Sequence, residues 1–362
     1  MKLEIKKIRL HELEGFVNSE TFRHLTTVPI TRLRTTSYIH NPNGKPDDVV
    51  LIMGFINNRL VAFRTIFAGL IHSNGEHVRF GWLSGNWIHP DFRRRGYSEQ
   101  LLSEALIEWD GKLMSTNYAP ESEKLFLKTG RFHPIHQFKG ARAYLFPKTI
   151  KLFNKVNQKR IVKPFLSVTD RLISIISEAR LLFFTSKKPD AVRFVEIDTP
   201  DEECFQYNQQ NNPRNIYIRN KAELNWIFQH PWISVIDKDH IKKYPFSSYS
   251  ESFRYKTVKI FTEGNFKGFF IFSLRNGHLK TLYFNIAGSS VKVVVNYLKS
   301  YCIENRIEIV TIYNSTIAKE FIAQKFPFLY IKKYGQKIYS SFKIKNGQEL
   351  QFQDGDGDTF FT

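Results

Sequence analysis

A short segment joins a strand-like run to a helix-like run and carries a distinctive cluster of charge. HPDFRRRGYS (His89–Ser98) places Arg93, Arg94, Arg95 and Gly96 at this junction. The first N–H groups of a helix lack intrahelical partners and carry the positive end of the helix dipole. Glycine lets the backbone approach a bound group where a Cβ would block it, and the arginines add positive charge. The pattern therefore predicts an anion-binding turn whose natural occupant is a pyrophosphate.

The elements that must position this turn follow a β-β-β-α-β-α-β order. Apolar runs separated by short polar turns predict three strands, at Val49–Ile56, Leu60–Ile71 and His77–Ile88. Gly85 lies inside the third strand, where a glycine often marks either a bulge or a close approach of another group to the backbone. A helix with apolar residues at helical spacing follows, then a short strand and a second helix that begins at Pro120. This order predicts an α/β sandwich around a mixed sheet.

Two motifs in this region resemble those of the GNAT superfamily of N-acetyltransferases. Residues Arg93–Ser98 are similar to its Q/R-x-x-G-x-G/A loop, and the preceding Trp87-Ile88-His89-Pro90 resembles its x-V-x-P element. The second motif resembles the family's N-x-x-S/A-x-x-L-Y-x-K-x-G-F segment and comprises Asn117, Ser122, Leu125, Phe126, Lys128, Gly130 and Phe132. The resemblance covers Val49–Phe138. Two motifs in the expected strand and helix context are more specific than either alone.

The resemblance implies where a CoA thioester binds. Backbone amides of Arg94–Ser98 are expected to hold the CoA pyrophosphate. The strand of Trp87 and Ile88 is expected to splay from the strand ending at Asn117, so that pantetheine lies between them, and a backbone N–H near Ile88 then stabilises the oxyanion. The donor is acetyl-CoA, which the amine attacks directly in a ternary complex. The cofactor-binding residues expected in this way are Trp87, Ile88, His89, Arg93, Arg94, Arg95, Gly96, Tyr97, Ser98, Asn117, Ser122 and Phe126.

The catalytic groups are not fixed by the sequence. Phe126 stands where many relatives have the tyrosine that protonates the leaving thiolate, and phenylalanine has no proton to donate. Ser84, together with Asn86, is one candidate, because the two side chains can position a water as base. The terminal carboxylate of Thr362 is the other candidate, if the tail QDGDGDTFFT inserts into a pocket. Otherwise this tail is an acidic turn, and the sequence does not choose between these alternatives.

The second half of the chain repeats the same order of elements. Strands are predicted at Lys256–Thr262, Phe266–Leu274, Leu279–Asn285 and Ile307–Tyr313, helices at Val291–Asn305 and Ser315–Lys325, and closing strands at Phe328–Lys333 and Lys337–Ile344. Ile286–Ser290 stands at the phosphate-loop position but has no arginine. We therefore expect the fold class α/β (α+β), with two GNAT-like mixed-sheet sandwich domains, an active-type N-terminal copy and a degenerate C-terminal copy.

The predicted domain boundaries are 1–146 for the CoA-binding catalytic domain, 147–190 for a basic helical connector, and 191–362 for the degenerate domain. The connector contains an amphipathic helix, Arg171–Phe184, which Pro164 is expected to separate from a preceding helix. Its apolar stripe either packs between the domains, which we favour, or lies on an anionic membrane. Further on, Trp226 and Trp232 are expected to pack onto the second sheet rather than to stack nucleic-acid bases.

Charge and composition bound the partners and the compartment. The net charge of +19 either attracts anionic partners, among them the CoA phosphates, an anionic membrane surface and nucleic acid, or belongs to a basic solvated surface with no dedicated partner. Cys204 and Cys302 are far apart and have no spacing typical of a zinc site, so no metal is expected. No apolar run approaches the roughly 18 to 20 residues of a membrane span. We therefore expect no integral membrane association and a cytoplasmic location, and the oligomeric state is not predicted.

Three functions stay open, of which a CoA-dependent N-acyltransferase is favoured. It would move an acetyl group from acetyl-CoA to a primary amine of a small molecule, an aminosugar or a peptide. A noncatalytic acyl-CoA-binding or scaffold protein is the second, because Phe126 replaces the acid and no base is evident. A Fem-type aminoacyl-tRNA-dependent transferase is the third, but the intact CoA loop argues against nucleic acid as a partner. Val28–Asp48 is either a wall of the acceptor pocket, through Arg32, Arg34 and Tyr38, or an ordinary connecting loop.

Overall fold

The computed structural model describes residues 2–73, 76–117, 120–146, 159–181, 191–211, 219–236, 243–344 and 352–362. Its contacts form two compact units. Unit 1 comprises Met1–Gln137, Thr199–Phe253 and Gln336–Thr362, and unit 2 comprises Phe138–Asp198 and Arg254–Gly335. Each unit is therefore assembled from segments that are distant in sequence, an arrangement that the linear boundaries 1–146, 147–190 and 191–362 do not follow.

Unit 1 is built on a mixed sheet with the order β1-β2-β3-β4-β5-β12. The first four strands pair antiparallel, β5 runs parallel to β4, and the end of β12 pairs antiparallel with β5. Nearly every side chain of β2 is buried, as expected for a strand that is apolar throughout. The strands are β1 (Glu4–Arg9), β2 (Val49–Ile56), β3 (Arg59–Ser73), β4 (Glu76–Ile88), β5 (Leu113–Asn117) and β12 (Tyr330–Ser340).

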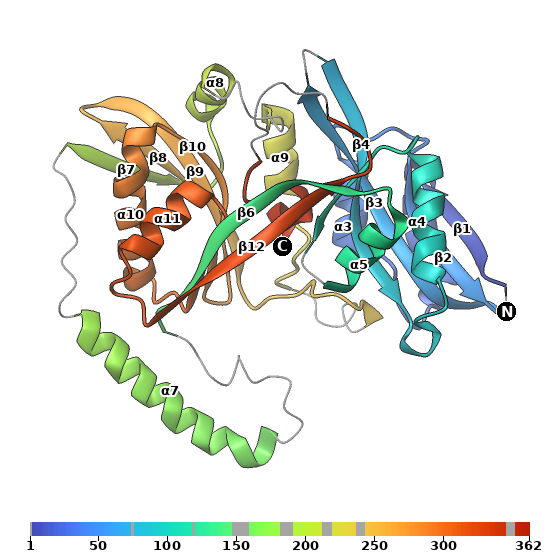
Figure 1. The fold of residues 1–362 in the computed structure, drawn as a ribbon, viewed down its shortest axis with the longest axis horizontal. Helices are drawn as coiled ribbons and strands as arrows, with labels where there is room; N and C mark the ends of the chain where they lie inside the picture. Colours follow the sequence, from blue (N-terminus) through green and yellow to red (C-terminus); the bar gives the residue numbers. More distant parts are fainter. Residues whose placement is uncertain are drawn as a thin grey trace. The chain divides into compact units, whose positions relative to one another are not determined.

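Helix α4 (Tyr97–Glu108) covers one face of this sheet and begins directly after the arginine turn. Its buried residues recur at helical spacing, at Leu101, Leu102, Ala105 and Leu106, and pack with the apolar side chains of β2 and β3 (Figure 1). Other helices of unit 1 are α1 (Leu13–Asn18), α2 (Glu20–Arg23), α3 (Arg32–Ile39), α5 (Pro120–Thr129), α8 (Glu202–Gln210), α9 (Lys221–Gln229) and the 3-10 helix η5 (Gly357–Phe361).

The strands of unit 2 follow the order β6-β11-β10-β9-β8-β7. β11 runs parallel to β10, whereas β10 with β9, β11 with β6 and β7 with β8 pair antiparallel. Helices α10 (Val291–Glu304) and α11 (Ser315–Ala323) pack on these strands and share an apolar core with them (Figure 1). The predicted strand and helix order of the second half is therefore present, and the mixed α/β fold class is confirmed. Its elements are β6 (His133–Tyr144), α7 (Lys159–Leu181), β7 (Val192–Ile197), β8 (Phe253–Thr262), β9 (Asn265–Arg275), β10 (His278–Ile286), α10 (Val291–Glu304), β11 (Ile309–Ile312) and α11 (Ser315–Ala323).

Two long strands pass from one unit to the other. β6 begins in unit 1, but its residues Ala141–Tyr144 pair with β11 of unit 2. β12 begins in unit 2, but its residues Lys337–Ser340 pair with β5 of unit 1. In the sequence, β6 follows α4, β5 and α5 of unit 1 but pairs in unit 2. In the same way, β12 follows α10, β11 and α11 of unit 2 but pairs in unit 1.

Two predicted breaks in regular structure are absent. The two closing strands expected at Phe328–Lys333 and Lys337–Ile344 form one strand, β12, because Gly335 continues the extended backbone rather than ending it. A Cβ at Gly335 would lie 3.1 Å from the Phe138 carbonyl oxygen, so the glycine allows a close backbone approach. Pro164 does not divide the connector, since α7 runs through it from Lys159 to Leu181. The rest of the predicted connector, 147–158 and 182–190, lies outside the described residues.

Candidate active site

A bulge at Gly85 organises the central strand of unit 1. Arg64 pairs with Asn86 and Thr65 with Ser84, which leaves Gly85 as an extra residue in β4. Its φ of 63° lies in the left-handed region, and a Cβ there would lie 2.9 Å from Thr65 Oγ1. The bulge expected at this glycine is confirmed. Because Arg64 and Thr65 are consecutive in a strand, their cross-strand partners Asn86 and Ser84 point to opposite faces of the sheet.

The bulge coincides with the end of pairing between β4 and β5. The parallel pairs run from Gly81 with Leu113 to Leu83 with Ser115. Beyond them β4 continues to Ile88, and β5 continues to Asn117. This stretch of β4 therefore presents an edge on the side where β5 was its neighbour, at the place where the sequence predicts a splay.

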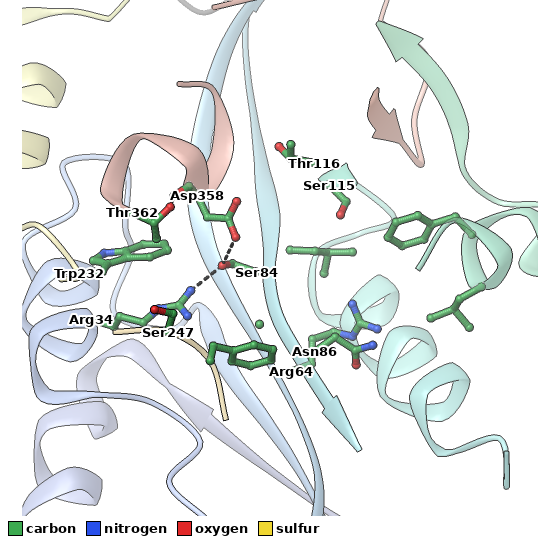
Figure 2. A pocket seen from close by; sticks show the side chains of 15 residues that line it. Arg34, Arg64, Ser84, Asn86, Ser115, Thr116, Trp232, Ser247, Asp358 and Thr362 are labelled. Carbon is green, nitrogen blue, oxygen red and sulfur yellow. Dashed lines mark hydrogen bonds between the residues drawn. The ribbon is translucent and has the colours of Figure 1, made fainter. Parts of the chain in front are cut away.

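A cavity of about 350 Å³ opens at this point, and its lining belongs to unit 1. Arg64 and Asn86 line it on the side of the sheet that carries α4 (Figure 2). Phe126, which packs in the apolar cluster of the α4 residues, lines it as well. Arg34, Ser84 and Asp358 line it on the opposite side, together with Trp232 and Thr362. The cavity therefore connects the two faces of the sheet beside the bulge.

Ser84 is the centre of a hydrogen-bond network on the face away from α4. Its hydroxyl donates to Asp358 Oδ2 at 2.9 Å and accepts from Arg34 Nη2 at 2.5 Å (Figure 2). Arg34 also donates to the hydroxyl groups of Tyr244 and Tyr38, and its guanidinium carbon lies 4.0 Å from the Trp232 ring centroid. Desolvation raises the pKa of the Tyr38 and Tyr244 hydroxyls, so both stay protonated around neutral pH. The network therefore joins a guanidinium to a carboxylate through one serine hydroxyl.

The carboxylate of this network comes from the C-terminal tail, most of whose side chains are buried. Phe361 has no exposed surface and stacks on Trp232 with a centroid separation of 4.4 Å and an interplanar angle of 8°. Asp356 is also fully buried and accepts a hydrogen bond of 3.2 Å from Arg219 Nη2. Of the two alternatives left open by the sequence, the structure therefore has the inserted tail, with Thr362 lining the cavity.

The arginine turn lies at the start of α4, on the other face. Arg94 and Gly96 have φ values of 62° and 78°, and Gly96 directly precedes the first residue of the helix. A Cβ at Gly96 would meet no atom within 4 Å, so the backbone there borders open space. Ser98 Oγ accepts a hydrogen bond of 3.0 Å from the Asn86 amide, which ties the first turn of α4 to the bulged part of β4. The turn therefore combines a left-handed backbone with an open helix N-terminus.

The other residues of the predicted cofactor-binding set lie in or next to β4, in the arginine turn and in the β5–α5 segment. Trp87 stacks on Phe63 at 5.5 Å, and Ile88 packs partly buried against the α4 core. The His89 ring is 2.6 Å from Arg59 Nη2. Remaining members of the predicted set are Arg93 and Arg95, which are exposed, Tyr97, which is buried, and Asn117 and Ser122, whose side chains lie outside the described part of the chain.

Phe126 lines the cavity and cannot take part in proton transfer. It is 2% exposed, and its ring centroid lies 4.6 Å from that of Phe132 and 5.5 Å from that of Tyr339. It therefore forms an apolar wall on the α4 side of the cavity.

Sequence reasoning missed several lining residues that come from distant segments. Trp226 and Trp232 were expected on the second sheet, and this is wrong, because Thr199–Phe253 belongs to unit 1. There the Trp226 indole donates to the Ser37 carbonyl at 2.6 Å. Arg64 was also missed, although a single arginine inside the apolar run LVAFRTIFAGLI is a signal in itself. Of Arg34 and Tyr38, which the sequence did offer, α3 places Arg34 at the cavity and Tyr38 in hydrogen-bond contact with Arg34.

Neither a metal centre nor a membrane-spanning helix is found in the part of the chain that the structure describes. Within those ranges, no three His, Cys, Asp or Glu side chains are grouped so that they could hold a metal ion. Among the same residues, no helix combines the length and apolar character needed to cross a membrane.

Comparison with solved structures identifies the fold. A tandem GNAT protein from the clavulanic acid biosynthesis pathway has a TM-score of 0.51 and 10% identity, over 94% of this chain and 99% of that chain. A probable N-acyltransferase from Enterococcus faecalis has a TM-score of 0.51 and 10% identity, over 94% of this chain and 72% of that chain. Saccharomyces cerevisiae N-myristoyltransferase with bound myristoyl-CoA has a TM-score of 0.52 and 12% identity, over 99% of this chain and 89% of that chain.

At the level of sequence, no family model and no curated protein matches the chain. At identities this low, the structural likeness defines the fold alone. The chain therefore has a tandem GNAT-like fold, as the two motifs of the first half and the repeated order of elements in the second half predict.

Proposed function

We propose that the protein is a CoA-dependent N-acyltransferase that transfers an acetyl group from acetyl-CoA to a primary amine. The cavity at the Gly85 bulge is the observation that carries this proposal. It joins the face that carries the arginine turn to the face that carries the half-buried carboxylate of Asp358, so a donor and an acceptor can meet from opposite sides of the sheet. Unit 1 is the active-type copy in this proposal, and unit 2 is the degenerate one.

The donor would bind on the α4 face. Backbone amides of Arg94–Ser98, at an open helix N-terminus, suit the CoA pyrophosphate. Pantetheine would lie along the edge of β4 beyond Leu83, where parallel pairing with β5 has ended, and hydrogen-bond to it as an added strand. The N–H groups of the bulged segment between Gly85 and Ile88 would then stabilise the oxyanion that forms on the thioester carbonyl.

The acceptor would approach from the face of Arg34, Ser84 and Asp358. Its amine nitrogen forms a bond to the thioester carbon, the carbon–sulfur bond breaks, and the nitrogen must lose a proton. Asp358, held by Ser84, is placed to accept this proton. Phe126 offers no proton, so the CoA thiolate takes one from solvent.

One experiment separates this function from a noncatalytic acyl-CoA-binding role, which Phe126 favours. Purified protein is incubated with acetyl-CoA and a panel of primary amines that includes aminosugars and short peptides, and free thiol is measured. We expect at least one amine to raise thiol release above the amine-free hydrolysis rate. Saturable acetyl-CoA binding without amine-dependent thiol release would instead support the binding role. A tRNA-dependent transferase would require tRNA to compete with acetyl-CoA, which we do not expect.

Acetyl-CoA as the donor and a cytoplasmic location are part of this proposal. The solved relatives include an N-myristoyltransferase with myristoyl-CoA, so the chain length of the acyl group is open to test. The same thiol assay with acyl-CoAs of increasing length measures it directly. We expect the acetyl group to be preferred, because the polar lining residues Arg64, Ser115 and Thr116 disfavour a long aliphatic chain.

A further inference from the structure

Arg64 is a buried cation at the cavity, and no described residue accepts a hydrogen bond from its Nε or Nη2. It lies in β3, is 2% exposed and lines the cavity. Within the described part of the chain, its Nε and Nη2 atoms are buried and have no hydrogen-bond partner. The buried arginines Arg34 and Arg219 differ, because Arg34 donates to Ser84 and Arg219 to Asp356. Arg64 is therefore an unsatisfied guanidinium that borders an open space.

An unpaired buried guanidinium is unfavourable for folding. Burial lowers the pKa of Arg64 to about 10, which reflects the loss of solvent around the charge. Buried charges in proteins are paired, since removal from water costs several kcal/mol per ion. A ligand that supplies the missing acceptor oxygens would remove this penalty.

The position of Arg64 shows which side of the reaction it serves. Its cross-strand partner is Asn86, whose amide donates to Ser98 in the first turn of α4. Arg64 therefore lies on the α4 face, near the positive end of that helix and its arginine turn. Asp358 and Thr362 line the opposite side of the cavity, so no carboxylate of the lining lies on the Arg64 face (Figure 2). Positive charge from the helix end and the arginine thus converges on one mouth of the cavity.

We propose that Arg64 is the buried half of an anion subsite that binds an oxyanion of the donor. The proposal rests on the proposed function. The ligand chemistry is a phosphate or carboxylate oxygen pair, which matches the planar fork of a guanidinium. A donor carries such oxygens in two places: on the phosphates of CoA, of which the pyrophosphate is nearest the arginine turn in this proposal, and on a carboxylate at the end of a dicarboxylic acyl group. In either case Arg64 contacts the donor, whereas Arg34 on the other face stays bonded to Ser84.

The test compares Arg64→Met and Arg64→Lys with the wild-type protein by calorimetric titration. The probes are acetyl-CoA and succinyl-CoA, and Arg23→Met, at an exposed position outside the cavity, controls for the change in net charge. If the pyrophosphate is the ligand, Arg64→Met weakens binding of both thioesters by about 10- to 100-fold. If an acyl carboxylate is the ligand, Arg64→Met weakens binding of succinyl-CoA by this factor and leaves binding of acetyl-CoA unchanged. In both cases Arg64→Lys restores part of the loss.

Thermal unfolding without ligand provides a second readout. Because Arg64→Met removes an unpaired buried charge, its melting temperature without CoA should equal or exceed that of the wild-type protein. Equal affinity of Arg64→Met and wild type for both thioesters would overturn the inference, as would a lower melting temperature, which would assign Arg64 a structural role. Failure of the wild-type protein itself to bind either thioester would instead remove the proposed function.

Discussion

Ser84 Oγ lies 2.9 Å from Asp358 Oδ2, although 274 residues separate the two along the chain. Ser84 is the last regular residue of β4 before the Gly85 bulge, and Asp358 belongs to η5 in the buried tail. The acceptor face of the cavity is therefore completed by η5, a segment far from β4 in the sequence. This contact places a carboxylate next to the opening in the sheet, where the proposed reaction needs a base.

Replacing Asp358 should impair the chemical step. We expect Asp358→Asn to lower kcat by about 10² to 10⁴, the range typical for a general base, with little change in acetyl-CoA affinity. Ser84→Ala should lower kcat less, because it removes the support of the carboxylate and not the carboxylate itself. Steady-state thiol release gives kcat, and calorimetry gives the affinity. Asp47→Asn, at a side chain that is 87% exposed, is the matched control. A wild-type kcat in Asp358→Asn would exclude this residue as the base.

Phe361 should anchor the tail. Phe361→Ala removes a fully buried ring that stacks on Trp232, and we expect it to destabilise the protein by about 3 to 5 kcal/mol. It should also lower kcat, because Asp358 lies three residues earlier in the same helix. Chemical denaturation and the thiol assay measure these effects. Tyr330→Ala, at a residue that is 58% exposed, should change stability much less. Equal stability of the two variants would mean that the tail does not pack as described.

The stability of the tail should depend on pH through Asp356. Burial raises the pKa of the Asp356 carboxyl from 3.8 to about 6, although the Arg219 guanidinium acts in the opposite direction. The folded state therefore binds this proton more tightly than the unfolded state, so the stabilising contribution is present below about pH 4 and is lost as the pH rises through about 6. Relative to Asp356→Asn, which does not titrate, the free energy of unfolding of the wild-type protein should fall by at most about 3 kcal/mol over this pH interval.

Denaturation of both proteins at several pH values between 4 and 7 measures this difference. A difference in the free energy of unfolding that stays constant, or that grows in favour of the wild-type protein with rising pH, would contradict it. The comparison between two variants matters because other carboxylates titrate in the same interval and cancel in the difference.

Local patterns in the sequence predicted the elements of unit 1 well. Val49–Ile56 has the predicted bounds, and α4 starts where the glycine of the arginine turn ends. These features depend on apolar periodicity and turn chemistry, which act over a few residues. The bulge at Gly85 was also predicted, because a glycine weakens the interior of an apolar strand and is typical of places where the strand bends or another group comes close.

What the sequence did not predict depends on contacts between distant segments. Trp232 and Asp358 come from segments that are far from β4 in the sequence. Only the folded chain brings them to the cavity beside β4. The exchange of β6 and β12 between units has the same origin, since strand pairing is set by the fold and not by adjacency in sequence. Arg64 was missed for another reason, because its strand was judged by its apolar neighbours.

Calorimetric titration of acetyl-CoA into the wild-type protein and Gly96→Glu tests the central claim most directly. Gly96 has a φ of 78° beside open space, so a glutamate fits but adds strain and negative charge at the proposed pyrophosphate site. Gly264→Glu is a matched control, because Gly264 has the same φ of 78° and equally open space in unit 2. We predict saturable binding at one site per chain in the wild-type protein and in Gly264→Glu, and binding at least about 100-fold weaker in Gly96→Glu. Unchanged affinity in Gly96→Glu, or no binding by the wild-type protein, would contradict the account.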